Sequence, residues 1–148
     1  MSIEIHKATA DHLDLLAPLF DAYRRFYGCA EDLPAARAFL AERIDHDESV
    51  IFLAVLDGKP AGFTQLYPTF TSIGIKRAWI LNDLYVSPEA RRNGVGRQLM
   101  EAARRMAVES SAAWIELATA KDNDSAQSLY RNCGYCKDEV YDRFKLDL

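Results

Sequence analysis

The order of apolar and polar residues predicts a chain in which strands and helices alternate. Strand-like runs rich in β-branched and aromatic residues occupy residues 3–8, 50–56, 61–67, 78–86 and 112–119, and the turn DGKP joins the second and third into a hairpin. Apolar residues at helical spacing predict helices over residues 9–28, 34–44, 94–110 and 122–134. Two further strands are expected near Tyr135–Glu139 and Tyr141–Leu146. The order β-α-α-β-β-β-α-β-α-β-β predicts an α/β fold in which helices cover a mixed sheet.

Length and composition are those of one globular domain that spans residues 1–148. Hydrophobic residues make up 49% of the chain and charged residues 27%, which is ordinary for a soluble protein. No apolar run is long enough to cross a membrane and no secretory signal is visible, so we expect a cytoplasmic location and no membrane partner. A net charge of −4 argues against nucleic-acid binding, because neutralising phosphates requires a basic face.

The cysteines and histidines predict neither a redox pair nor a metal site. Cys133 and Cys136 form a C-x-x-C motif, but a redox pair of this kind stands at the start of a helix. Here Cys133 lies at the end of a predicted helix that Asp124 caps and Gly134 closes. The three histidines are scattered far upstream, so the four ligands that zinc requires are not assembled.

An anion-binding loop is predicted where the strand over residues 78–86 meets the helix over residues 94–110, in the stretch RRNGVGRQLM. The first N–H groups of a helix are unpaired and its dipole favours negative charge there, whereas three arginines at that end repel one another unless an anion binds. A P-loop is excluded because no lysine is followed by serine or threonine. A dinucleotide fingerprint is excluded because Leu99 stands at the place of its third glycine.

The remaining pattern, R-x-x-G-x-G with Arg91, Gly94 and Gly96, resembles the pyrophosphate-binding loop of the GNAT superfamily of N-acetyltransferases. The surrounding stretch LNDLYVSPEARRNGVGRQLMEAARRMA resembles the strand–loop–helix of that family. NDSAQSLYRNCGY resembles its second signature, N-x-x-A-x-x-L-Y-x-x-x-G-[FY]. The element order agrees over essentially the whole chain. The resemblance implies a mixed, mostly antiparallel sheet with helices on both faces, and an N-acetyltransferase that uses acetyl-coenzyme A (acetyl-CoA) as acyl donor.

The resemblance also implies where acetyl-CoA binds and which group acts as acid. The cofactor-binding residues would be Leu84, Tyr85, Val86, Arg91, Arg92, Asn93, Gly94, Val95, Gly96, Arg97, Asn123 and Tyr130. Arg92 stands where many relatives carry glycine, so it must keep a negative φ or bear the cost of a left-handed conformation. Tyr130 takes the place of the tyrosine that protonates the leaving thiolate, although its position in a helical apolar stripe would otherwise indicate a core residue.

The acceptor amine must lose a proton, because an ammonium group with a pKa near 10.4 is almost fully charged at neutral pH. Asp83 and Glu116 on central strands are candidates to receive it, with Tyr23 and Tyr27 as aromatic neighbours. The stretch NDLYV resembles EDFFV of the diamine (polyamine) acetyltransferases, but Asn82 replaces the glutamate, and Asp83 could instead pair with an arginine.

Several alternatives for the acceptor stay open at this point. Acidic residues at positions 31–32 and 45–48 suggest a small cationic amine, and a solvated acidic loop explains them equally well. A protein lysine or N-terminus as acceptor, and a non-catalytic acyl-CoA sensor, are the alternatives to a small-molecule enzyme. Relatives are often homodimers, and the C-terminal strands with Tyr141 and Phe144 could supply such an interface.

Overall fold

The computed structural model describes residues 2–148, which divide into two compact units, one ending at Ala118 and one formed by Thr119–Leu148. In chain order the elements are β1 (Ile3–Lys7), the short 3-10 helix η1 (Ala10–His12), α1 (Leu13–Phe26), α2 (Leu33–Asp45), β2 (Val50–Leu56), β3 (Lys59–Thr71), β4 (Lys76–Val86), η2 (Pro88–Ala90), α3 (Val95–Glu109), β5 (Ile115–Glu116) and α4 (Asp124–Asn132). No helix among the described residues is long and apolar enough to cross a bilayer.

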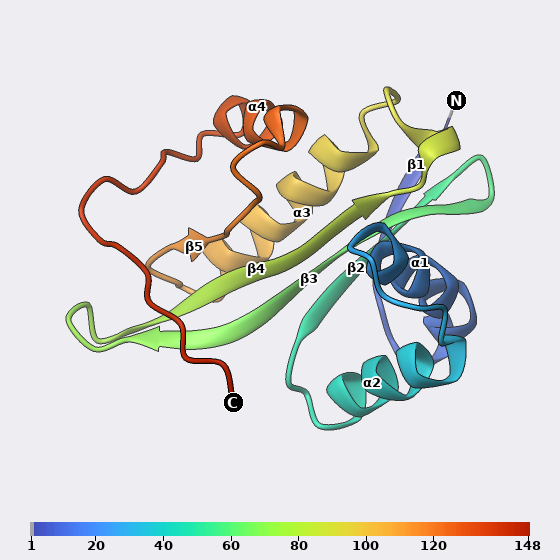
Figure 1. The fold of residues 1–148 in the computed structure, drawn as a ribbon, viewed down its shortest axis with the longest axis horizontal. Coiled ribbons are helices and arrows are strands. Elements are labelled where there is room, and N and C mark those ends of the chain that lie inside the picture. Colours follow the sequence, from blue (N-terminus) through green and yellow to red (C-terminus); the bar gives the residue numbers. More distant parts are fainter. Residues whose placement is uncertain (1) are drawn as a thin grey trace. The chain divides into compact units, whose positions relative to one another are not determined.

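The first unit is built on a five-stranded sheet in the order β1-β2-β3-β4-β5 (Figure 1). The pairs β1–β2, β2–β3 and β3–β4 are antiparallel, and β5 alone runs parallel to its neighbour β4. The prediction of a mixed, mostly antiparallel sheet is therefore confirmed. The chain reaches β5 through α3, as expected for a crossover between parallel strands.

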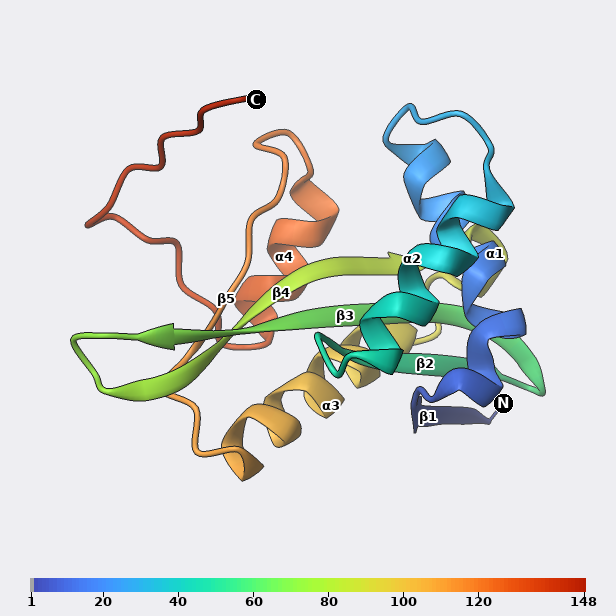
Figure 2. The same cartoon turned by 90° about the horizontal axis from the view of Figure 1, so that it is seen from below.

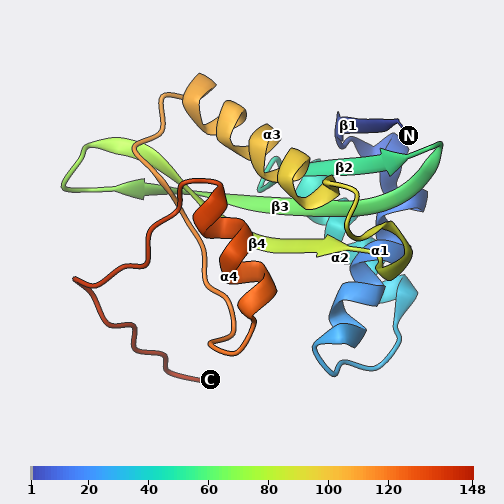
Figure 3. The ribbon, with the colours of Figure 1, turned by 90° about the horizontal axis from the view of Figure 1, so that it is seen from above.

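Helices cover both faces of this sheet, as Figures 2 and 3 show for α3 on one side and α1 with α2 on the other. Because side chains alternate along a strand, β2 serves both layers. Ile51 and Leu53 are buried in one cluster with residues of α1 and α2, whereas Phe52 and Ala54, also buried, point the opposite way. Phe63 of β3 completes the α1–α2 side, with no exposed surface.

Strands β3 and β4 form a longer hairpin than the sequence predicted. They pair from Gly62 with Val86 to Thr71 with Lys76, so the stretch PTFT, expected between strands, belongs to β3. The prediction ended at Tyr67 because proline cannot donate a ladder hydrogen bond and normally terminates a strand. Pro68 instead lies within β3, opposite Trp79.

Several details of the predicted elements toward the C-terminus are wrong. The strands near Tyr135–Glu139 and Tyr141–Leu146 are not formed, and residues 135–148 contain no strand. Their aromatic and branched residues favour extended backbone, but a strand also needs a hydrogen-bonded neighbour and burial of one face. Phe144 and Leu146 are 96% and 82% exposed, so neither condition is met. Likewise β5 spans two residues rather than eight, and Asn123 rather than Asp124 caps α4.

Candidate active site

The loop between β4 and α3 presents an uncapped helix start. Two of its residues are left-handed, Arg92 with φ 66° and Gly94 with φ 81°. Gly94 directly precedes α3, no side chain caps that end, and the first turn contains no acidic residue. By contrast, the Asp32 side chain caps α2 by accepting a hydrogen bond from the backbone N–H of Ala35. The N–H groups and dipole at the start of α3 are therefore suited to binding an anion.

Hydrogen bonds inside the loop hold this conformation. The Asn93 amide donates to the carbonyl oxygens of Ala90 and Arg91, at 3.0 and 3.2 Å. Arg91 Nε donates to the carbonyl oxygen of Val86 at 3.0 Å, which uses one of the five guanidinium N–H donors. Arg91 thus braces the loop against the end of β4, a role that its place in the motif did not indicate. The side chain of Arg92 is exposed beside it.

The end of β4 that leads into this loop has an unpaired edge. β5 pairs with β4 only at Trp79–Ile115 and Ile80–Glu116. From Leu81 to Val86 that edge of β4 has no neighbouring strand among residues 2–148, as can be followed in Figure 1. An extended ligand can pair with such an edge through main-chain hydrogen bonds.

On its other edge, the same end of β4 is held tightly against β3 by Gly62. A Cβ atom on Gly62 would lie 2.5 Å from the carbonyl oxygen of Tyr85 and 3.2 Å from Cα of Val86. Both neighbours are backbone atoms, so they could not give way without moving β4. Ser87 adds two hydrogen bonds to Ala61, from its backbone N–H at 2.8 Å and from its hydroxyl at 3.1 Å.

Asp83 lies on the α1–α2 face of the sheet and is only 4% exposed. Gln65 Nε2 donates to Asp83 Oδ2 at 2.8 Å, and Asn82 Nδ2 donates to Oδ1 at 3.1 Å. The side chain of Tyr23 forms a third hydrogen bond. Burial raises the pKa of Asp83 above its usual range, and the three hydrogen bonds partly oppose this shift. The structure thus brings together Tyr23, Asn82 and Asp83, three of the residues that the sequence suggested for the acceptor site.

A β-bulge at Asn82 determines which way Asp83 points. Gln65 pairs with Asp83 and Leu66 with Leu81, so Asn82 is an extra residue in β4. Leu81 consequently shares a face with Leu66, whereas Asp83 shares the opposite face with Gln65. Without the bulge, Leu81 and Asp83 would point the same way.

Aromatic rings pack around Tyr23, whose side chain hydrogen-bonds to this carboxyl group. The ring of Tyr23 meets those of Tyr27, Phe63 and Tyr85 at centroid distances of 5.1, 5.7 and 6.2 Å. Tyr27 is 57% exposed, so one side of the cluster faces solvent. An open cavity of about 330 Å³ also borders Tyr85, between α1 and residues 85–89. Tyrosine faces attract cations, which suits an ammonium ligand.

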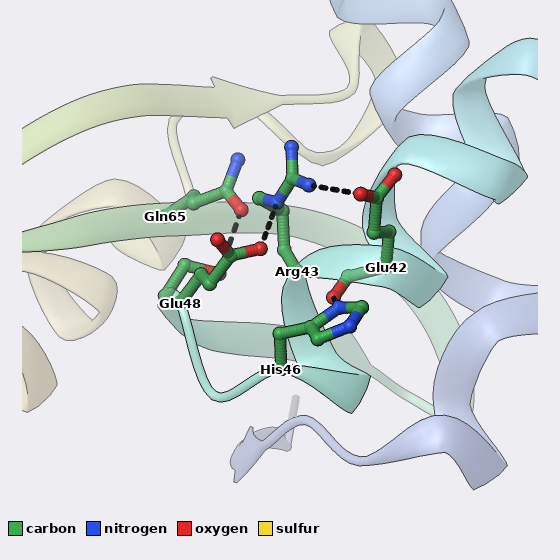
Figure 4. Close-up of polar contacts among 6 residues, drawn as sticks. Glu42, Arg43, His46, Glu48 and Gln65 are labelled. Carbon is green, nitrogen blue, oxygen red and sulfur yellow. Dashed lines mark hydrogen bonds and ion pairs between the residues drawn. The ribbon is translucent and has the colours of Figure 1, made fainter.

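Arg43 of α2 lies near the same face and is held by two carboxylates (Figure 4). Its Nε contacts Glu48 Oε1 at 3.0 Å and its Nη2 contacts Glu42 Oε1 at 3.2 Å. Asp32 and Glu48, from the two acidic stretches of the sequence, therefore have structural partners.

The charges of Asp83 and Arg43 both act on the phenol of Tyr67 in β3. Burial, reinforced by the charge of Asp83 and opposed by that of Arg43, raises the pKa of Tyr67 to about 12. The phenol is therefore neutral at physiological pH.

Asn123 and Tyr130 belong to the second unit and take part in its one helix, α4. Asn123 Oδ1 accepts a hydrogen bond of 3.2 Å from the backbone N–H of Ala126, so this side chain caps the helix. Tyr130 is half-buried, and its ring centroid lies 6.2 Å from that of Tyr135. Gly134, left-handed with φ 93°, closes the helix as the sequence predicted.

Glu116 lies half-buried on β5. Cys133 is the C-cap that directly follows α4 and does not stand at its start, and no disulfide joins the three cysteines. In residues 2–148 no group of three or more histidine, cysteine, aspartate or glutamate residues is placed to hold a metal ion.

Sequence reasoning missed Gln65, which donates a hydrogen bond to Asp83. It also missed Ser49, which bonds to Gln65, and Tyr67, whose pKa responds to the charges of Asp83 and Arg43. One signal was available: the strand AGFTQLY places a glutamine at a position that its alternation assigns to the core. The structure confirms that Gln65 has no exposed surface.

Comparison with known proteins places the chain in a family. Residues 16–135 match the acetyltransferase (GNAT) family. The chain is 43% identical over 146 residues to the uncharacterized N-acetyltransferase YhfO of Bacillus subtilis, covering 99% of this chain and 98% of that protein. The crystal structure of a probable acetyltransferase superposes with a TM-score of 0.92 at 44% identity and covers 100% of this chain and 98% of the other.

A more distant relative has a named acceptor. Thialysine N-epsilon-acetyltransferase of Caenorhabditis elegans is 25% identical over 149 residues, covering 99% of this chain and 92% of that protein. Together with the loop at the start of α3 and the unpaired edge of β4, these similarities show that the chain is an acetyltransferase of the GNAT family.

Proposed function

We propose that the protein transfers the acetyl group of acetyl-CoA to the primary amine of a small cationic molecule. The observation that carries this proposal is the uncapped start of α3 on left-handed Gly94, next to the unpaired edge of β4. Acetyl-CoA is the donor that the family uses, so the loop and the strand edge supply the two surfaces that such a molecule needs.

The residues of the loop fit the diphosphate of coenzyme A. The backbone N–H groups of Asn93–Arg97 would bind its oxygens, and the exposed guanidinium groups of Arg92 and Arg97 would add charge. The free edge of Leu84–Val86 would pair with the amide groups of the pantetheine arm. Gly62 supports this arrangement because it lets β3 hold the end of β4 in place.

The acceptor would bind on the α1–α2 face. The carboxyl group of Asp83 offers a partner for an ammonium group, and Tyr23 and Tyr27 offer aromatic faces. The C. elegans relative is named for an amine on a side chain, and NDLYV resembles a stretch of polyamine acetyltransferases; both support a small aliphatic amine.

Two proton transfers complete the proposed reaction. Asp83 receives a proton from the ammonium group, which frees the nitrogen lone pair to attack the thioester carbonyl. Tyr130, at the signature position of the family acid, donates a proton to the departing thiolate. The match of NDSAQSLYRNCGY to the second family signature supports this assignment.

A screen of amines with detection of released thiol tests the proposal. Spermidine, thialysine, an aminoglycoside and a lysine peptide are each incubated with protein and acetyl-CoA. We expect thiol release with at least one small amine and not with the peptide. Peptide turnover alone would indicate a protein acetyltransferase. Tight acetyl-CoA binding without thiol release from any amine would indicate an acyl-CoA sensor.

A further inference from the structure

A line of three polar side chains, two of them buried and Ser49 half-buried, crosses the α1–α2 face of the sheet. Ser49 Oγ donates to Gln65 Oε1 at 2.9 Å, and Gln65 Nε2 donates to Asp83 Oδ2 at 2.8 Å. Gln65 has no exposed surface and Asp83 is 4% exposed. Figure 4 shows Gln65 on β3 together with the ion pairs of Arg43. A buried amide and carboxylate cost stability unless their hydrogen bonds are satisfied, so this arrangement calls for a functional explanation.

The hydrogen bonds of the line suit an ionised Asp83. The Gln65 amide directs its NH₂ group at the carboxylate while its carbonyl oxygen accepts from Ser49. The opposite orientation of the amide would bring two acceptor oxygens together unless Asp83 were protonated. Gln65 therefore favours the charged form of Asp83, against the burial that disfavours it.

The charge of Asp83 nevertheless has no counter-ion within the described part of the chain. The groups that face it are Tyr23 from α1, Gln65 and Tyr67 from β3, and Asn82 from β4 itself. Arg43 approaches from α2 but is paired with Glu42 and Glu48. Hydrogen-bond donors thus surround a carboxylate that no lysine or arginine in residues 2–148 neutralises by an ion pair, and an ammonium ligand would supply the missing charge.

We propose that Gln65, fixed by Ser49, is a positioning residue that keeps the Asp83 carboxylate charged and directed at the acceptor amine. This inference rests on the proposed acetyl transfer. It adds how Asp83, the base, is kept in the charged form that can accept a proton. Asp83 takes one proton from the ammonium group, the C–N bond forms as the C–S bond breaks, and Tyr130 gives its proton to the thiolate. The second nitrogen proton passes to water, and Tyr130 regains a proton from water. Asp83 then releases its proton to water, so the reaction yields amide, free thiol and one proton.

The test compares Gln65→Met, Ser49→Ala and the control Ser110→Ala. Methionine keeps the length of glutamine and removes the donor. Ser110 Oγ accepts a hydrogen bond of 2.9 Å from Trp79 Nε1, so its replacement removes a partly buried hydroxyl away from Asp83. The first readout is the pKa of Asp83, measured by carbon NMR of its carboxyl group in the protein without substrate. A hydrogen bond to a charged group corresponds to a shift of about one to two pH units.

We expect Gln65→Met to raise the pKa of Asp83 by about that amount, Ser49→Ala to raise it less, and Ser110→Ala to leave it unchanged. The second readout is the acidic limb of kcat/KM against pH, measured with thialysine or, if it is inert, spermidine. This limb should move to higher pH by the same amount, whereas the Kd for coenzyme A should not change.

An acidic limb that stays in place while the pKa moves would overturn the inference, as would equal shifts in the Ser110 control. If Gln65→Met does not fold, the smaller shift in Ser49→Ala decides the question. Absence of thiol release by the unaltered protein with every amine would instead refute the proposed function. The NMR readout does not depend on that outcome.

Discussion

The left-handed conformation of Arg92 leads to a prediction that separates backbone strain from charge. An L-residue in this region costs roughly 1–2 kcal/mol, and glycine avoids that cost. Glycine also makes the unfolded chain more flexible, which stabilises the unfolded state and offsets roughly 0.4–1 kcal/mol of that gain. We therefore expect Arg92→Gly to raise the free energy of unfolding by about 1 kcal/mol. For a chain of this length, the melting temperature should rise by about 2–4 °C.

Arg92→Ala is the matched variant, because alanine keeps the strained backbone and loses the guanidinium group. Its melting temperature should stay close to that of the unaltered protein. Coenzyme A should bind more weakly to both variants by the same factor. We expect a loss of about five- to thirtyfold, which corresponds to about 1–2 kcal/mol for one exposed charge-assisted hydrogen bond.

Thermal unfolding followed by circular dichroism and titration calorimetry with coenzyme A measure the two effects. Equal melting temperatures for the glycine and alanine variants would show that position 92 bears no left-handed strain. Unchanged affinity in both variants would show that the Arg92 guanidinium does not contact the phosphates.

Three other substitutions test separate parts of the account. Gly62→Ala should abolish tight acetyl-CoA binding and lower the melting temperature, because its Cβ would collide with the backbone of Tyr85; normal affinity in calorimetry would contradict this. Tyr130→Phe should slow thiol release many-fold with unchanged acetyl-CoA affinity, and equal turnover would remove Tyr130 as the acid. Because burial raises the pKa of Asp83, folded protein binds this proton more readily than unfolded protein does, so stability falls as pH rises from the usual carboxyl pKa to the raised one. Asp83→Asn lacks this loss of stability. Between about pH 4 and about pH 8, urea unfolding should therefore show the free energy of unfolding of the variant rising relative to that of the unaltered protein. The same difference in free energy of unfolding at both pH values would refute the raised pKa.

The sequence predicted those elements whose own pattern decides their structure. The bounds of β2 agree with the prediction, and α3 follows from the apolar spacing of Leu99, Ala103 and Ala107. Gly94 was recognised from the R-x-x-G-x-G motif, and its left-handed conformation directly before α3 gives the physical reason for glycine at that place. Such features are local, so residues adjacent in the chain carry the information.

Features that depend on distant partners were not predictable in the same way. The bulge at Asn82 becomes visible only when β4 is paired with β3, since nothing in AWILNDLYV marks an extra residue. The line from Ser49 through Gln65 to Asp83 joins the residue before β2 to one position on β3 and one on β4, which only the sheet register brings together. The prediction of C-terminal strands was wrong for a related reason. The alternation of Phe144 and Leu146 predicts a strand, but a strand forms only beside a pairing partner, which the local sequence does not specify.

The central claim is that main-chain amides at the start of α3 bind the diphosphate of acetyl-CoA, so that the edge of β4 can present the thioester. A crystal structure of the protein with coenzyme A tests it most directly. The account predicts diphosphate oxygens within hydrogen-bond distance of the N–H groups of residues 93–97, with the pantetheine arm along Leu84–Val86. A diphosphate bound elsewhere on the protein, with these amides facing water, would contradict it.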